Sequence, residues 1–428
     1  MVKNYQDALQ WIHQREKFKI KPGLARMTWM MERLNHPEER IQAVHIAGTN
    51  GKGSTVSFLR ELLQAHGLSV GTFTSPYIVR FNERISVNGE PVEDGDLADL
   101  VNRIKPVAEE LADTPLGAPT EFEVITAMSL VYFAEKELDV VIYEAGLGGL
   151  YDSTNILSPI LTIITNIGKD HMNILGSTYA QIAREKAGII KPGIPVITAA
   201  KQEESIQIIR EKAAQEKSDF YINGEDFHTV HLESSDEGEV FEFHNDRFIS
   251  KPLLSRMMGA HQVDNAALAI QAMEVLQGLG YSFEREYYRS AIRATHWPAR
   301  FEKVQEEPLV ILDGAHNEEG TRALVETVKE HYSNKRVTLL YSALEDKPVQ
   351  AMLTMLSEVV DCAFMTSFNF PRALSAEQLQ QLSPVKRTEA IDSYQEAVST
   401  SLSQMEDDEL LLVTGSLYFL SEIRKIFE

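Results

Sequence analysis

Three glycines and one lysine lie in the stretch GTNGKGST, residues 48–55, between the apolar run IQAVHIA and the amphipathic stretch VSFLRELLQAHG. Glycine is costly to order, so this cluster between a predicted strand and a predicted helix indicates a close approach of backbone to a ligand. Backbone N–H groups at a helix N-terminus and the charge of Lys52 favour a phosphate chain. Ser54 or Thr55 offers a hydroxyl group to Mg²⁺. The alternative is an ordinary glycine-rich turn with a solvated lysine, but the flanking elements favour phosphate binding.

Two further predicted strands end in residues that can bind a metal. DVVIYE ends at Glu144, and ILTIITNIGKDH ends at Asp170 and His171. Strand ends of a doubly wound sheet meet at one edge, so these side chains and Ser54 can form a Mg²⁺ site, although histidine is a less usual ligand for that ion. Taken singly, Glu144 reads equally well as a strand-end acid and His171 as a loop residue bonded to backbone.

Charged residues that are candidates for a functional role also occur later in the sequence. Lys186 in REKAGIIKPG lies near a predicted helix end, and its spacing alone favours stabilisation of the helix dipole. Arg300 in WPAR and Asp313 and His316 in ILDGAHN flank a predicted domain junction. Arg300 and Asp313 are equally consistent with closure over a nucleotide and with an interdomain salt bridge.

The elements that must position these residues alternate between strand and helix from about residue 41 to 200. A helix is predicted from Ser54 to His66, and Thr120 with Glu123 forms a capping box that starts a second helix. This alternation predicts a mostly parallel, doubly wound sheet of the phosphate-loop type. Residues 218–256 alternate polar and apolar side chains, which predicts a small antiparallel β appendage.

The Trp-Pro pair in ATHWPAR marks a domain junction, so we expect domains at residues 1–296 and 297–428. We expect the first to be a phosphate-binding α/β domain, with the β-rich insertion at about 218–256. The second contains the strand candidates PLVILDGAHN, RVTLLYSA, CAFMTSF and LLLVTGS, and is predicted to be a smaller, Rossmann-like α/β domain.

Composition disfavours several classes of function. The 428 residues carry a formal net charge of −22, which disfavours general binding to nucleic acid or to anionic membranes. The single cysteine, Cys362, cannot form an intrachain disulfide. The N-terminus has no signal-like apolar segment, and no apolar run approaches the length of a membrane span. We therefore expect a cytoplasmic protein. Separately, we expect a monomer.

These motifs, in this order, resemble the folylpolyglutamate synthase and dihydrofolate synthase family, within the Mur-type ATP-dependent amide ligases. The matching stretches span nearly the whole chain: KPGLARM, HIAGTNGKGST, TSPYIVRFNERISVNG, TEFEVITAM, EAGLGGLYDSTN, ITNIGKDHMNILG, IAREKAGIIKPG, GAHQVDNAALA, HWPARFE, LDGAHN and VTGSLYFL.

The resemblance implies a set of site residues. ATP is bound by Asn50, Gly51, Lys52, Gly53, Ser54, Asn265, Arg300, Asp313 and His316. Two Mg²⁺ ions are held by Ser54, Ser75, Glu144, His171 and Lys186, the last as a carbamate formed with CO₂. Lys52, Lys186 and His171 are the catalytic residues. The folate or pterin is bound by Thr120, Glu121, Phe122, Glu123, Tyr151, Asp152 and Ser153.

The implied reaction joins L-glutamate to a folate through an acyl phosphate made with ATP. A bifunctional enzyme would also use dihydropteroate. Four positions depart from the family pattern: Leu150 replaces arginine in GLGGR, Tyr77 replaces histidine, Lys169 replaces leucine and Ala299 replaces glycine. Leu150 keeps two alternatives open. One is a Mur-type paralogue with a different carboxylate acceptor, and the other is a nucleotide-binding regulator without catalysis.

Overall fold

The computed structural model describes residues 1–15, 23–406 and 408–427. Lys21 and Pro22 of the KPGLARM stretch lie outside these residues. The chain divides into two compact units. The first comprises residues 1–228, 243–249 and 265–292, and the second comprises residues 229–242, 250–264 and 293–428.

The first unit is built on an eight-stranded sheet with the strand order β4-β3-β2-β5-β1-β6-β7-β8. The strands are β1 Ala43–Ala47, β2 Val70–Phe73, β3 Ile85–Val87, β4 Glu90–Pro91, β5 Val140–Glu144, β6 Leu161–Ile164, β7 Val196–Thr198 and β8 Phe220–Ile222. All pairs from β2 to β8 are parallel, and β3 and β4 add an antiparallel edge. The central strands are apolar and fully buried, as strands covered on both faces require.

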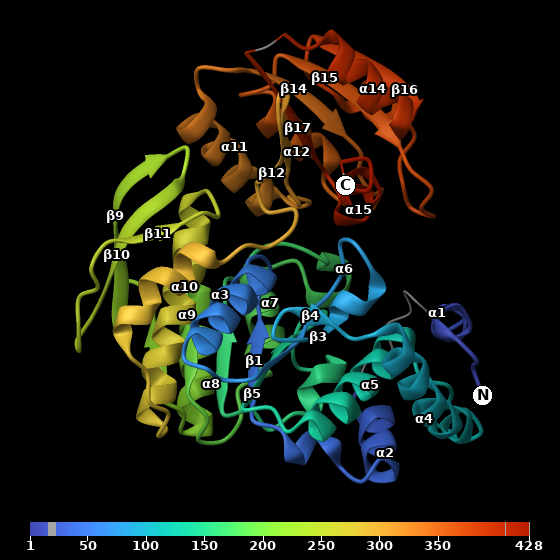
Figure 1. The fold of residues 1–428 in the computed structure, drawn as a ribbon, viewed down its shortest axis with the longest axis vertical. Helices are drawn as coiled ribbons and strands as arrows, with labels where there is room; N and C mark the ends of the chain where they lie inside the picture. The colour runs from blue at the N-terminus through green and yellow to red at the C-terminus, as the bar shows by residue number, and fades with distance from the viewer. Residues whose placement is uncertain (16–22, 407, 428) are drawn as a thin grey trace. The chain divides into compact units, whose positions relative to one another are not determined.

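Helices cover the two faces of this sheet (Figure 1). One core joins β2 and β5 to the helices α1 Tyr5–His13, α2 Ala25–Arg33, α4 Asp94–Ala112 and α5 Glu121–Lys136. Another joins β6 and β7 to α7 Tyr179–Ala187 and α8 Glu203–Glu216. The remaining helices of this unit include α3 Lys52–Ala65 and α6 Met172–Leu175. The doubly wound arrangement predicted from strand–helix alternation is therefore confirmed.

Local sequence explains where the site-bearing helices begin. The predicted capping box at the start of α5 is present: the Thr120 hydroxyl accepts from the Glu123 amide, and the Glu123 carboxylate accepts from the Thr120 amide. Helix α3 begins at Lys52, two residues before the predicted start, because Gly51 takes a left-handed conformation (φ +81°) that lets the chain turn directly into the helix.

The predicted β appendage is a three-stranded antiparallel sheet, β11-β10-β9, with β9 Phe227–Ser235, β10 Gly238–Asn245 and β11 Leu253–Ser255. It begins at β9 rather than at residue 218, because β8 pairs in parallel with β7 in the large sheet. Helix α9, Ala260–Gly278, and helix α10, Tyr288–Ala294, follow.

The second unit contains a six-stranded sheet with the order β12-β13-β17-β14-β15-β16. Its strands are β12 Glu302–Glu306, β13 Leu309–Leu312, β14 Arg336–Tyr341, β15 Cys362–Ser367, β16 Arg387–Ser393 and β17 Glu409–Thr414. All of its pairs are parallel except β12 with β13. The helices are α11 Glu318–Tyr332, α12 Val349–Leu356, α13 Ala376–Leu382, α14 Tyr394–Gln404 and α15 Leu417–Arg424. The predicted smaller α/β fold is confirmed.

Candidate functional site

The glycine-rich loop joins the end of central strand β1 to the start of α3. A Cβ atom on Gly48 would lie 1.8 Å from the Thr165 hydroxyl oxygen, and one on Gly51 would lie 2.3 Å from the Asn265 side-chain oxygen. Any side chain at either position would therefore collide with its neighbour. The loop backbone is packed tightly between the end of β6 and helix α9, which leaves its N–H groups at the N-terminus of α3 in position to meet an anion.

Lys52 folds back over this loop. Its Nζ donates to the carbonyl oxygens of Gly48 at 3.1 Å and Thr49 at 3.3 Å, and lies 3.8 Å from Glu144 Oε1. Glu144 ends β5, its side chain is almost fully buried, and it accepts a hydrogen bond from the Ser75 amide at 3.4 Å. The structure thus brings Lys52, Ser75 and Glu144 together at the carboxyl edge of the sheet, as strand order predicts.

The hydroxyl groups at the start of α3 are buried. Ser54 is 1% exposed and Thr55 is fully buried, and neither hydroxyl oxygen has a hydrogen-bond partner within the described part of the chain. Buried polar atoms are nearly always paired, so these two hydroxyl groups are available to bind a ligand atom. Hydroxyl and carboxylate oxygens, such as those of Ser54 and Glu144, are the kind of ligand that Mg²⁺ prefers.

Lys186, on α7, is buried against the same loop. Its side-chain amine donates to the Gly48 carbonyl oxygen at 2.8 Å, and only 3% of the residue is exposed. Burial, followed by the charge of Lys52, lowers the pKa of Lys186 to about 7. A large fraction of this amine is therefore neutral, and nucleophilic, at neutral pH. Spacing alone favoured a helix-end role for Lys186, and it gave no sign of this burial.

The loop after β6 holds the phosphate loop through side chains that sequence reasoning did not single out. Thr165 donates to the Asn50 carbonyl at 2.6 Å, and Asn166 accepts from the Asn50 amide at 2.9 Å. Thr49 and Gly168 exchange two hydrogen bonds. The signal was present, because the motif ITNIGKDH follows directly on a buried strand, but only the pairing of β6 with β1 shows which loop it supports.

His171 lies farther along this loop and is more exposed. It caps α6 in a left-handed conformation (φ +50°), and 41% of its side chain is accessible. Its Nε2 lies 3.9 Å from Asp170 Oδ2, and the Asp170 side chain is 90% buried. The structure therefore places Asp170 as well as His171 at this edge.

The residues predicted to bind folate have different surroundings. Glu123 is buried in the capping box and in an ion pair with Arg26 at 2.9 Å. Glu121 is paired with His13 at 3.1 Å. Phe122 is half-buried and packs against Gly146, where a Cβ atom would lie 2.5 Å from its ring.

The remaining three predicted folate residues follow the loop after β5. Tyr151 is 54% exposed, Asp152 is buried and bonded to backbone amides, and Ser153 starts a short 3-10 helix, Ser153–Ile156. Phe122 and Tyr151 therefore offer accessible aromatic surface, whereas Thr120, Glu123 and Asp152 are committed to holding the backbone.

The predicted nucleotide residues of the second unit cluster at the end of β13. Asp313 is buried and accepts from the amides of Phe301 and Ala315, each at 2.9 Å. Burial raises its pKa, and the nearby charge of Arg300 opposes that change. Arg300 donates to the Ala299 carbonyl at 2.9 Å, and His316 Nδ1 lies 2.7 Å from the Gly314 carbonyl oxygen.

Ala299 itself has a left-handed backbone, with φ +56°, and is fully buried. This conformation is costly for any residue with a Cβ atom and free for glycine. The departure from WPGR to WPAR therefore introduces backbone strain directly beside Arg300.

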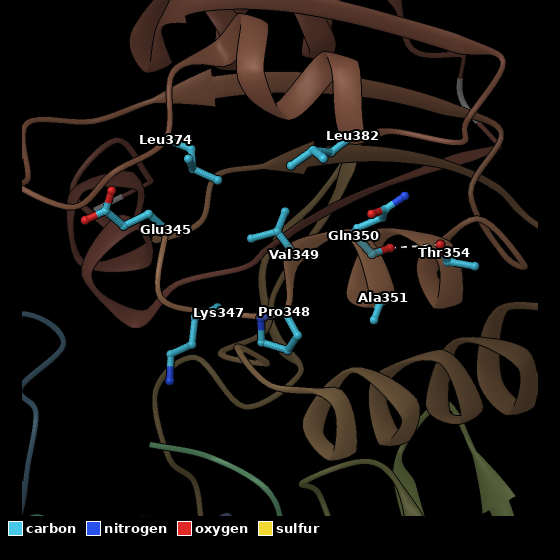
Figure 2. Close-up of a pocket in the computed structure, with 9 residues that line it drawn as sticks. All are labelled: Glu345, Lys347, Pro348, Val349, Gln350, Ala351, Thr354, Leu374 and Leu382. Atoms are coloured by element: carbon cyan, nitrogen blue, oxygen red, sulfur yellow. Dashed lines mark hydrogen bonds between the residues drawn. The ribbon is translucent and has the colours of Figure 1, made fainter. Parts of the chain in front are cut away.

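An open pocket lies in the second unit between α12 and α13 (Figure 2). Both charged and apolar side chains line it: Glu345, Lys347, Pro348, Val349, Gln350, Ala351, Thr354, Leu374 and Leu382. None of the predicted site residues is among them. No helix in the described part of the chain is long and apolar enough to cross a membrane.

Comparisons with known proteins agree with this geometry. Residues 46–273 match the model of the Mur ligase middle domain, and residues 299–417 match that of the Mur ligase glutamate ligase domain. The chain is 48% identical over 427 residues to the Bacillus subtilis (strain 168) dihydrofolate synthase/folylpolyglutamate synthase, and the match covers 99% of both chains. It is 33% identical over 425 residues to Lacticaseibacillus casei folylpolyglutamate synthase, covering 99% of this chain and 98% of that one.

A solved structure of Mycobacterium tuberculosis folylpolyglutamate synthase complexed with ADP superposes with a TM-score of 0.93 at 27% identity, and covers 99% of this chain and 98% of that one. The likeness therefore extends over both units of the chain and over the loops that carry the site.

Proposed function

The chain belongs to the folylpolyglutamate synthase and dihydrofolate synthase family of Mur ligases, and from this premise we propose that it uses ATP to join L-glutamate to the carboxylate of a folate. The observation that carries the proposal is the convergence of Lys52, Lys186 and Glu144 on the loop around Gly48. The arrangement combines cationic, nucleophilic and metal-binding groups at the N-terminus of α3.

A carboxylate is a poor acyl donor, so the reaction begins with its activation. A folate carboxylate oxygen attacks the γ-phosphorus of ATP, and ADP leaves. The amine of glutamate then attacks the carbonyl carbon of the acyl phosphate, inorganic phosphate leaves, and an amide forms. Phosphoryl transfer depends chiefly on alignment and charge neutralisation, which Lys52 and the loop N–H groups supply.

Mg²⁺ fits the residues present. The unpaired buried hydroxyl of Ser54 and the buried carboxylate of Glu144 are oxygen donors, and we propose that Ser75, His171 and the carbamate of Lys186 complete two sites. When bound, Mg²⁺ neutralises phosphate charge during transfer.

The surroundings of Lys186 support carbamylation. A neutral amine adds to CO₂, a proton is released, and the product is an N-carboxylate anion. Burial favours the neutral amine that this addition needs, and the nearby cationic Lys52 stabilises the anion that results. Modification would thus replace an amine next to Gly48 with a ligand that suits Mg²⁺.

For nucleotide binding, we propose a role for Asn50, Gly51, Gly53 and Asn265 in the first unit. We propose the same role, separately, for Arg300, Asp313 and His316 in the second unit. The role of Asn265 is supported by its closeness to Gly51, where an added Cβ atom would lie 2.3 Å from the Asn265 side-chain oxygen. Arg300 and Asp313 are supported by their shared position at the end of β13.

For the acceptor, Phe122 and Tyr151 are proposed to contact the pterin, with Glu121 and Ser153 beside them. Thr120, Glu123 and Asp152 support these contacts from buried positions. A second activity, synthesis of dihydrofolate from dihydropteroate, is favoured by the dual name of the Bacillus subtilis relative, which matches over almost the full length of both chains.

The test is ADP formation with ATP, glutamate and one acceptor at a time: dihydropteroate, tetrahydrofolate monoglutamate or a polyglutamate. We expect turnover with tetrahydrofolate only when glutamate is also present. No turnover with any of the three acceptors would refute the proposal. ADP release that does not depend on acceptor and glutamate would favour a nucleotide-binding regulator, and turnover without dihydropteroate activity would remove the second function.

A further inference from the structure

A buried chain of hydrogen bonds runs from the central strand β1 to the loop that follows β5. His45, on β1, is fully buried, and its Nε2 lies 2.8 Å from the hydroxyl oxygen of Thr154. Thr154 is also fully buried, and its hydroxyl donates to Asp152 Oδ1. We call His45, Thr154 and Asp152 the β1 relay.

The donors in this relay can be assigned. A threonine hydroxyl has one proton, and that proton is directed at Asp152. The hydroxyl oxygen must therefore accept from His45, which places the imidazole proton on Nε2. Burial lowers the pKa of His45 to about 3, so the ring stays neutral at neutral pH. His45 is thus a fixed donor and not a proton carrier.

Asp152 connects the relay to the loop at residues 145–151 through hydrogen bonds. Its Oδ2 accepts from the Leu147 amide at 2.7 Å, and its Oδ1 accepts from the Thr154 amide at 3.0 Å. At the other end of the loop, Asn155 donates to the Leu150 carbonyl at 3.0 Å. Both ends of the loop are therefore fixed by side chains from one short segment.

This loop separates the proposed metal ligand from the proposed acceptor surface. It starts directly after Glu144, its Gly146 packs against the ring of Phe122, and it ends at the exposed Leu150 and Tyr151. His45 lies two residues before the end of β1, where the phosphate loop begins. One chain of bonds thus joins the strand that carries the phosphate loop to the surface that faces the acceptor.

We propose that His45 and Thr154 are positioning residues for the acceptor: through Asp152 they hold the loop 145–151 against Phe122, in register with the phosphate loop. The inference rests on the proposed function, since the acceptor is a folate. Neither residue touches substrate, so their effect is on acceptor binding and alignment. The phosphate contacts proposed for Lys52 and the loop amides use groups outside the β1 relay.

The test compares steady-state kinetics of Thr154→Val and Thr154→Ser. Valine keeps the shape and removes the hydroxyl, so we expect the KM for tetrahydrofolate to rise roughly tenfold, as for other residues that orient a binding group. The KM for ATP should stay within about twofold, because the lost interaction belongs to acceptor binding. Serine keeps the hydroxyl and should restore the wild-type acceptor KM.

Thr162→Val is the matched control. Thr162 is fully buried on β6, opposite His45 in the sheet, but its hydroxyl donates to the Pro195 carbonyl and lies outside the relay. It should lose stability without a change in acceptor KM. The proposal would be overturned by a folded Thr154→Val enzyme whose acceptor KM equals that of the wild type. It would also be overturned if Thr154→Val and Thr162→Val changed the acceptor KM to the same extent.

His45 gives a second comparison in case Thr154→Val does not fold. Glutamine places an amide N–H near the position of Nε2, whereas asparagine is too short to reach Thr154. His45→Asn should raise the acceptor KM and His45→Gln should not, and equal KM values would contradict the relay. Hydrogen exchange of the Leu147 amide should be faster in Thr154→Val and in His45→Asn than in the wild type. This measurement tests the relay without any turnover. It therefore stays informative even if the wild-type enzyme shows no folate turnover, which is the result that would refute the proposed function.

Discussion

The side-chain amines of Lys52 and Lys186 both donate to the carbonyl oxygen of Gly48, at 3.1 and 2.8 Å. Two amines so close to one oxygen repel each other when both are charged, which is one cause of the lowered pKa of Lys186. The lowered pKa of Lys186 makes its amine available as a neutral nucleophile for CO₂.

Lys52→Ala should reduce amide formation by roughly a hundredfold or more, because it removes the cation that neutralises the transferring phosphoryl group. The thermal melt should change little, since the Lys52 side chain is partly exposed at the first residue of α3. Lys105→Ala, on the outer face of α4, is the control and should keep full activity. Near-normal turnover of Lys52→Ala would show that its phosphate role is wrong.

Lys186→Ala should lose activity to a similar degree, roughly a hundredfold, and a small carboxylic acid such as acetate should restore part of it by occupying the place of the carbamate. Wild-type protein in ¹³C-bicarbonate should give a carbamate carbonyl signal by NMR that the variant lacks. Absence of that signal in an active wild-type enzyme would refute carbamylation.

Ala299→Gly should stabilise the protein. Relief of the backbone strain at the left-handed alanine adds about 1–2 kcal/mol to the free energy of unfolding. The greater freedom of glycine in the unfolded chain offsets about 0.5–1 kcal/mol of this gain. The free energy of unfolding, measured with urea, should rise by the difference. Ala323→Gly, inside α11, is the opposite control and should lower it by about 1 kcal/mol. A destabilised Ala299→Gly protein would contradict the strain assigned to this position.

The stability of the second unit should depend on pH through Glu239 and His331, whose Oε1 and Nε2 lie 2.7 Å apart. Despite burial, hydrogen bonds from His331, Ser234, the Gly259 amide and His231 lower the pKa of Glu239 to about 2. The contribution of Glu239 to the free energy of unfolding is present above the unfolded pKa near 4.5 and is lost as pH falls toward 2.

Burial lowers the pKa of His331, but the hydrogen bond and charge of Glu239 outweigh this effect and raise it. The contribution of His331 to the free energy of unfolding is therefore full below the unfolded pKa near 6.5 and is lost as pH rises through the folded pKa. Urea midpoints should show Glu239→Gln and His331→Gln less stable than wild type at pH 6. The deficit of Glu239→Gln should shrink at acid pH, and that of His331→Gln at alkaline pH. A deficit that does not change with pH would exclude this linkage.

Sequence predicts those parts of the structure that depend on neighbouring residues. The capping box of Thr120 and Glu123 and the turn at Gly51 follow from short-range patterns, and both are present. The burial of Lys186 could not be predicted in this way, because its partner Gly48 is 138 residues away and meets it only after α7 packs on the sheet. For the same reason, the hydrogen bond between His45 and Thr154, which are 109 residues apart, could not be predicted from the sequence.

Side-chain exposure also separates residues that a motif treats alike. Within the motif YDST, Tyr151 is exposed while Asp152 and Thr154 are buried and hold the backbone. The family resemblance assigns Tyr151, Asp152 and Ser153 to one site, whereas burial shows which side chains can touch a substrate. Assignment of each role therefore required the packed structure.

The central claim is that the folate carboxylate is activated as an acyl phosphate, and oxygen labelling tests it most directly. With ¹⁸O in both carboxylate oxygens of the acceptor, one labelled oxygen should appear in the inorganic phosphate and the other should remain in the amide carbonyl. ADP should form in equal amount. Unlabelled phosphate, or label in AMP instead, would contradict phosphoryl transfer to the carboxylate and with it the role given to Lys52 and its loop.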